Sequence, residues 1–197
     1  MLDRRAVLLA LAATPLMAAA APVRVRMVTD LGVIVIELFV DKAPISSANF
    51  LAYADKGLLD GGSFYRTVSP KNDNNPATIS VIPGGLNRDD SPLPAIAHET
   101  TAATGLRHTD GVISMARDAP GTAGSEFFIC LGDNPALDFG GARNKDGQGF
   151  AAFGRVVEGM DVVRKILASK TDGVPTNPSM KGQMINPPVA IASARRI

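Results

Sequence analysis

The ratio of strand-like to helix-like segments limits the folds open to this chain more than any other feature of its sequence. β-Branched and aromatic residues gather in short runs, as they do in strands, whereas only two segments show helical spacing. Turn-rich stretches separate the runs, for example NRDDSPLP at 87–94 and DFGGARNKDGQG at 138–149. About eight strands are expected, at residues 23–28, 33–40, 63–68, 77–82, 111–117, 126–132, 150–157 and 188–197.

The two helical segments span residues 45–59 and 160–170. Gly57 and the glycine pair at 61–62 end the first, and Met160, Val163 and Ile166 form one face of the second. Strands and helices do not alternate regularly, which argues against a parallel α/β sheet. The sequence therefore predicts a mainly β fold, a closed eight-stranded antiparallel β-barrel capped by two α-helices. No internal repeat interrupts it, so a single domain is expected over residues 21–197.

The first twenty residues, MLDRRAVLLALAATPLMAAA, have the pattern of a secretory signal peptide. Arg4 and Arg5 precede an apolar run too short for a bilayer span, and small residues suited to cleavage follow. We expect cleavage within 18–21, by a Sec or a twin-arginine route, and a periplasmic or secreted mature protein. Removing Asp3, Arg4 and Arg5 takes the formal net charge from +1 to zero. This balance gives no indication of a nucleic-acid or membrane-surface partner.

Several residues that could carry covalent, metal or cofactor chemistry are better explained as structural. Cys130, the only cysteine, lies in the apolar run FFIC and is predicted to be a buried strand residue. His98 and His108 are the only histidines, too few for a zinc site, and are predicted to bond to backbone. Residues 147–152 match the G-x-G-x-x-A dinucleotide pattern, but turn residues precede them where a strand is required. We expect no metal, no cofactor and no covalent nucleophile.

The run GVISMARDAPGTAGSEFFICLGDNPALD, residues 111–138, resembles the central signature of the cyclophilin family of peptidyl-prolyl cis-trans isomerases. Further segments follow the family's order, among them SFYRTV at 63–68, PGG at 83–85 and FAAFGRVVEGMDVVRKI at 150–166. The resemblance covers nearly the whole mature chain and is closest in character to bacterial, often exported, members. It implies an enzyme whose barrel is closed by two helices and carries, on its outer face, a groove for a prolyl peptide.

The resemblance also implies roles for individual residues. Arg66, two positions after Phe64, matches the family's catalytic arginine, and Phe128 matches the aromatic floor of the proline pocket. The segment at 116–117 falls where the family lays the substrate backbone against an edge of the groove. The implied substrate-binding positions are Val81, Pro83, Ala116, Arg117, Phe128, Leu137 and Phe150.

The chain departs from the family pattern within this same groove. Pro83 stands where many members have a glutamine whose amide touches the substrate, and Glu126 replaces the glutamine of the family's S-Q-F-F. Residues 69–77 form an insertion relative to short members. We therefore interpret residues 64–85 as two strands of one groove, with Arg66 on the first, Val81 and Pro83 on the second, and the insertion as a loop at its edge.

The chemistry fits these residue types. An X-Pro bond isomerises over a barrier of about 18–20 kcal/mol, and a guanidinium can lower it by donating to the prolyl nitrogen without losing its own proton. Proline offers neither an amide hydrogen nor a polar side chain, so Pro83 predicts a rate roughly 10- to 100-fold below that of a glutamine-bearing enzyme. The expected partners are proline-containing exported polypeptides, bound by a monomer. The alternative is a chaperone or assembly factor that binds such segments without isomerising them.

Overall fold

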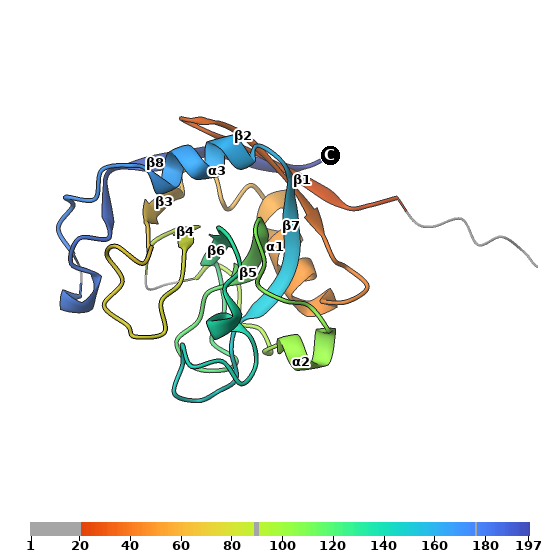
Figure 1. The fold of residues 1–197 in the computed structure, drawn as a ribbon. Coiled ribbons are helices and arrows are strands. Elements are labelled where there is room, and N and C mark those ends of the chain that lie inside the picture. Colours follow the sequence, from red (N-terminus) through yellow and green to blue (C-terminus); the bar gives the residue numbers. More distant parts are fainter. Residues whose placement is uncertain (1–20, 89–90, 176) are drawn as a thin grey trace, which may run out of the picture.

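The computed structural model describes residues 21–88, 91–175 and 177–197 (Figure 1). The predicted signal peptide, residues 1–20, lies outside this part of the chain. Among the described residues, no helix combines the length and apolar character needed to cross a membrane. The strands are β1 (Arg24–Thr29), β2 (Gly32–Leu38), β3 (Ser63–Arg66), β4 (Val81–Gly85), β5 (Val112–Met115), β6 (Phe127–Cys130), β7 (Ala151–Glu158) and β8 (Met184–Arg196).

These strands close into one barrel. Their order is β1-β2-β7-β5-β6-β4-β3-β8, and the paired strands run antiparallel. The predicted helices are α1 (Pro44–Asp55) and α3 (Met160–Leu167), and a third, α2 (Thr101–Thr104), was not predicted. The α2 segment is one turn long, capped by the Thr100 hydroxyl and ended by Gly105 at φ 70°, so it is too short to show helical periodicity. The predicted barrel architecture is confirmed.

Large apolar side chains fill the interior of the barrel. The ring centroid of Phe127 on β6 lies 5.5 Å from that of Phe50 on α1 and 5.8 Å from that of Phe64 on β3. Helix α3 adds Val163 and Ile166, both fully buried. Burial of these side chains is the main source of the barrel's stability.

Strand β6 separates this interior from a second apolar cluster. Successive side chains of a strand point to opposite faces, so Phe127 and Ile129 enter the barrel while Phe128 and Cys130 point outward. The outer cluster joins Phe128 and Cys130 to Val68, Ile79, Val81 and Leu137. Cys130 is completely buried, as predicted, and burial raises the pKa of its thiol. The groove predicted from the sequence lies over this outer cluster.

The position of β4 differs from its prediction. The alternation of ATISVI predicted a strand at 77–82, but β4 runs from Val81 to Gly85. The interpretation of residues 64–85, which placed Val81 and Pro83 on one strand, is confirmed. A glycine is required at 84 because a Cβ there would lie 2.7 Å from Cδ1 of Phe64. Residues 77–80 are held instead by side chains: Asp73 accepts a hydrogen bond from the amide of Ile79, and Asn134 accepts one from the amide of Ser80.

A bulge interrupts the pairing of β3 with β4 beside the predicted groove. Phe64 pairs with Gly84, but the next bridge joins Val68 to Val81, so three residues of one strand lie opposite two of the other. Arg66 is the middle residue of the three, and Pro83 lies across from it. Bulges of this kind redirect side chains and open the ladder locally. Arg66 and Pro83 therefore lie next to one another on the outer face of the barrel.

Candidate active site

All eight residues predicted from the sequence line one cavity of about 200 Å³ on the outer face of the barrel. They are Arg66, Val81, Pro83, Ala116, Arg117, Phe128, Leu137 and Phe150. They come from β3, β4 and β6, from the 3₁₀ turn at Pro135–Leu137, and from the segments that follow β5 and precede β7. Val68 and Ile79, which the sequence analysis did not select, line the same cavity.

The floor of the cavity is aromatic and fixed in place. The ring of Phe128 is largely buried and meets the ring of Phe150 edge to face, with centroids 5.3 Å apart. Val81 and Leu137 complete an apolar surface around it. A ring of proline size would contact this surface without finding a polar partner.

A buried polar triad supports this floor from beneath. The imidazole of His108 stacks on Phe128, and its two nitrogens lie 2.8 Å from the Asp138 carboxylate and 2.9 Å from the Ser114 hydroxyl. Burial lowers the pKa of His108, while Asp138 acts in the opposite direction. The Ser-His-Asp arrangement is closed to solvent, since Ser114 and His108 are at most 1% exposed.

The prediction that both histidines bond to backbone is therefore half right. His98 lies 3.2 Å from the backbone oxygen of Gln148, as predicted, but the prediction is wrong for the side chain of His108. The sequence could not show this, because Asp138 lies 30 residues further along the chain.

Arg66 reaches the cavity from the bulge in β3. Its Nε and Nη2 both donate to Oε1 of Gln183, at 2.9 and 2.5 Å. Burial lowers the pKa of the guanidinium, and Arg143 nearby acts in the same direction. An arginine nevertheless keeps its proton at physiological pH, so Arg66 brings a permanent positive charge to a cavity that Arg117 and Arg143 also line.

Arg117 is used differently from Arg66. Its side chain is 1% exposed and forms an ion pair with Asp146 at 2.7 Å. It also donates to the backbone oxygen of Gly149 and lies over the ring of Phe150, 5.3 Å from its centroid. Hydrogen bonds from Arg117 lower the pKa of Asp146 to about 2. The Arg117 side chain thus fastens the loop before β7 to the groove wall.

A second cavity, of about 510 Å³, adjoins the first and shares Tyr65, Arg66, Ala116 and Arg117 with it. Its base holds a contact that the sequence analysis missed: the Tyr65 hydroxyl donates to Glu126 at 2.8 Å. The same carboxylate accepts from the backbone amide of Asn87. Burial, and then the charge of Glu126, raise the pKa of Tyr65, which stays a neutral donor. Together the two cavities form a continuous groove on either side of Arg66.

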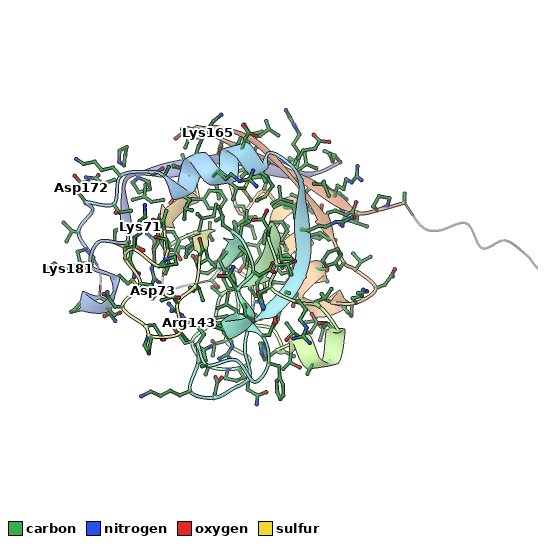
Figure 2. All side chains as sticks on the ribbon, in the orientation of Figure 1. Lys71, Asp73, Arg143, Lys165, Asp172 and Lys181 are labelled. Carbon is green, nitrogen blue, oxygen red and sulfur yellow. The ribbon has the colours of Figure 1, made fainter. Side chains whose placement is uncertain are left out.

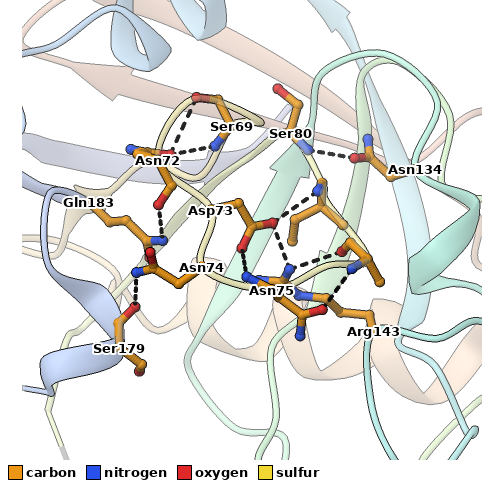
Figure 3. A network of polar contacts seen from close by, with 12 residues as sticks. Ser69, Asn72, Asp73, Asn74, Asn75, Ser80, Asn134, Arg143, Ser179 and Gln183 are labelled. Carbon is orange, nitrogen blue, oxygen red and sulfur yellow. Dashed lines mark hydrogen bonds and ion pairs between the residues drawn. The ribbon is translucent and has the colours of Figure 1, made fainter.

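The insertion at 69–77 packs behind Arg66. Figure 2 shows Asp73 and Arg143 close together on this side of the barrel, with Lys165 on α3 far from them, and the first two form an ion pair at 2.6 Å. In Figure 3 the insertion also meets the segment before β8, where Asn74 contacts Ser179 and Asn72 contacts Gln183. The insertion is therefore a fixed part of the groove's support.

Solved structures identify the class of fold. A cyclophilin type peptidyl-prolyl cis-trans isomerase from Cryptosporidium parvum, crystallised in the presence of the dipeptide Ala-Pro, superposes with a TM-score of 0.65 at 22% sequence identity. The match covers 87% of this chain and 97% of that chain. The fold is that of the cyclophilins.

The sequence comparisons then place the chain within that class. The family model described as cyclophilin type peptidyl-prolyl cis-trans isomerase/CLD matches residues 24–195. Peptidyl-prolyl cis-trans isomerase A of Dickeya dadantii is 34% identical over 93% of this chain and 90% of that protein. A peptidyl-prolyl cis-trans isomerase of Streptomyces antibioticus is 37% identical over 87% of this chain and 96% of that protein. The chain belongs to the cyclophilin type peptidyl-prolyl cis-trans isomerase family, and the predicted enzyme class is confirmed.

Proposed function

We propose that this enzyme isomerises X-Pro bonds in exported polypeptides, with Arg66 as its catalytic residue and the floor around Phe128 as its proline pocket. The observation that carries the proposal is that the guanidinium of Arg66 meets a mainly apolar cavity of about 200 Å³ in a single groove. By contrast, Arg117 and Arg143, which line the same cavity, are ion-paired with Asp146 and Asp73. The proline ring of the substrate enters the cavity. The chain on either side of it lies along the groove, past the backbone of Ala116 and Arg117.

The geometry suits a reaction that breaks no covalent bond. Twisting the X-Pro bond returns the lone pair to the prolyl nitrogen, where it becomes a hydrogen-bond acceptor that the planar amide lacks. A guanidinium beside the pocket donates to that nitrogen only in the twisted state. Binding the twisted state more tightly than either planar isomer accelerates both directions equally.

Pro83 is the basis for proposing a reduced rate. Its ring lines the cavity across the bulge from Arg66, at the position where an amide side chain could donate to the substrate. Without that donor, the twisted substrate makes one hydrogen bond fewer in the groove.

Export is proposed from the signal-like residues 1–20, and the similar proteins of Dickeya and Streptomyces are bacterial. In such a compartment the substrates are newly exported chains whose prolyl bonds equilibrate slowly. No second protomer is needed to complete the groove, so a monomer is proposed.

Exchange NMR spectroscopy of a prolyl tetrapeptide at substoichiometric protein tests the proposal. Arg66→Ala is expected to slow catalysed cis-trans exchange by about 100- to 1,000-fold, because the donor to the twisted nitrogen is lost. Arg26→Ala, which removes an exposed strand arginine of β1, is the matched control and should leave the rate unchanged. Unaltered exchange in Arg66→Ala would refute the assignment. Binding of the peptide without any catalysed exchange would favour the alternative, a chaperone or assembly factor.

A further inference from the structure

We propose that Gln183 is a positioning residue that holds the guanidinium of Arg66 in its working orientation. The proposal rests on the proposed function of Arg66. Pro83, on the β4 side of Arg66, offers no polar side chain, but Gln183 reaches the same guanidinium from the segment just before β8. Gln183 thus reaches Arg66 from the β8 side, where the following residue, Met184, pairs with Arg66.

The contact with Gln183 holds the guanidinium of Arg66 through two of its three nitrogens. Nε and Nη2 of Arg66 both donate to the one oxygen Oε1 of Gln183, at 2.9 and 2.5 Å. Because the guanidinium is planar, holding two of its nitrogens also sets the direction of the third, Nη1. A long side chain that would otherwise sample many rotamers is reduced to one orientation before the substrate arrives.

Gln183 is itself firmly anchored. Its side chain is inside the protein, with the residue 1% exposed. Its backbone oxygen accepts from the amide of Thr67 at 2.9 Å, and its own amide donates to the oxygen of Met180 at 3.0 Å. Its Nε2 donates to the backbone oxygen of Asn72 at 2.7 Å. These bonds fix the amide orientation, because Asn72 offers an acceptor on one side and Arg66 offers donors on the other.

The insertion provides the acceptor that completes this arrangement. Asn72 donates to the backbone oxygens of Thr67 and Gly182, at 3.2 and 3.0 Å, and accepts from the amide of Ser69 at 2.8 Å. Figure 3 shows Ser69, Asn72 and Gln183 as successive members of one network. The insertion therefore acts on the groove through Gln183, as a support for the catalytic arginine.

A neutral amide also suits this place better than a carboxylate would. An acidic side chain at 183 would form a buried ion pair with Arg66 and reduce the positive charge available to the substrate. The Gln183 oxygen orients the guanidinium while leaving its full charge to the groove. If the partner of Arg66 served only to stabilise the fold, a carboxylate would be as suitable at position 183 as an amide.

Gln183→Met tests the proposal, since it keeps the length of the side chain but removes the acceptor. We expect catalysed exchange of the prolyl tetrapeptide at saturation to fall about 5- to 30-fold, as the two hydrogen bonds that orient the guanidinium are lost. The peptide Kd, measured by NMR titration, should stay within about twofold because the apolar floor is untouched. Asn74→Ala is the matched control: it removes a contact between the same two segments, to Ser179, without touching Arg66. Equal rates in Gln183→Met and wild type would overturn the proposal, as would a loss confined to peptide affinity.

A second measurement needs no variant. The Nε–H of Arg66 in the wild-type protein should exchange with solvent more slowly than that of the exposed Arg26, and its guanidinium should rotate more slowly. Equal behaviour of the two arginines would overturn the proposal even if Gln183→Met failed to fold. If Arg66→Ala slows exchange and Gln183→Met does not, only the role of Gln183 fails. If Arg66→Ala leaves the rate unchanged, the proposed function itself fails.

Discussion

Replacing Pro83 by glutamine is expected to raise the catalytic rate, and the structure indicates what else the change would disturb. Just before β4, Ser80 accepts a hydrogen bond from Leu131, which follows β6. The next residue, Val81, donates to Val68, which follows β3. Successive residues along β4 therefore face β6 and β3 in turn. By this alternation the nitrogen of Pro83 faces β3, at the bulge. Its missing hydrogen therefore costs no bond to β6, which explains a proline inside a barrel strand.

The expected gain follows from one added hydrogen bond. The cavity of about 200 Å³ leaves room for the longer side chain beside Arg66. A donor that acts on the twisted substrate contributes about 1.4–2.8 kcal/mol, which corresponds to a rate about 10- to 100-fold higher. Losing the rigid ring of proline costs about 0.4–1 kcal/mol of folding stability, too little to unfold a domain.

The assay is exchange spectroscopy of the same tetrapeptide, with the thermal midpoint recorded for each variant. Pro83→Met is the matched control, because methionine resembles glutamine in length but has no amide. The reasoning predicts a faster Pro83→Gln enzyme and no acceleration in Pro83→Met. If both variants match the wild type, either Pro83 does not face the substrate or an amide has no role at this position.

Two further predictions concern the groove's support. Burial lowers the pKa of His108 in the folded protein below the ordinary histidine value of about 6.5. Around and below that pH the unfolded chain therefore binds more protons than the folded protein, so the free energy of unfolding should decline as the pH falls from 7 through 6. Denaturant titrations across this range check it, and His108→Gln should flatten the dependence; an equal slope in both proteins would contradict it. Arg143→Met should lower the free energy of unfolding by about 3 kcal/mol, because Asp73, 1% exposed at its side chain, would lose its ion-pair partner. Urea denaturation measures this loss of stability. If the double variant Asp73→Asn with Arg143→Met regains the lost stability, the unpaired carboxylate of Asp73 is its cause.

The barrel could be predicted from the sequence because its determinants are local. The opening hairpin, the two longer helices and most strands follow from alternation, helical spacing and turn residues. Strand β4 could not be placed this way. Its Pro-Gly-Gly sequence resembles a turn, and it is a strand only because Gly84 makes room for Phe64 and Pro83 faces the bulge.

The candidate site likewise contains residues that local sequence motifs predict and contacts that only the fold creates. Its eight predicted residues were found through motifs that lie within short stretches of the chain, and the fold brings them to one cavity. Gln183 lies 117 residues from Arg66, and only the irregular pairing of β3 with β8 brings the two together. The partnership of Asp73 with Arg143 depends in the same way on two loops whose conformations no local pattern determines.

The two apolar clusters on either side of β6 have a consequence for how this protein can evolve. The interior cluster fills the barrel, whereas the outer cluster lies under the proposed peptide groove, and the two share no buried residue. Substitutions in the groove can therefore accumulate under selection for new client sequences while the scaffold keeps its fold. Pro83 is such a position: it lines the proposed groove, and the barrel around it is closed.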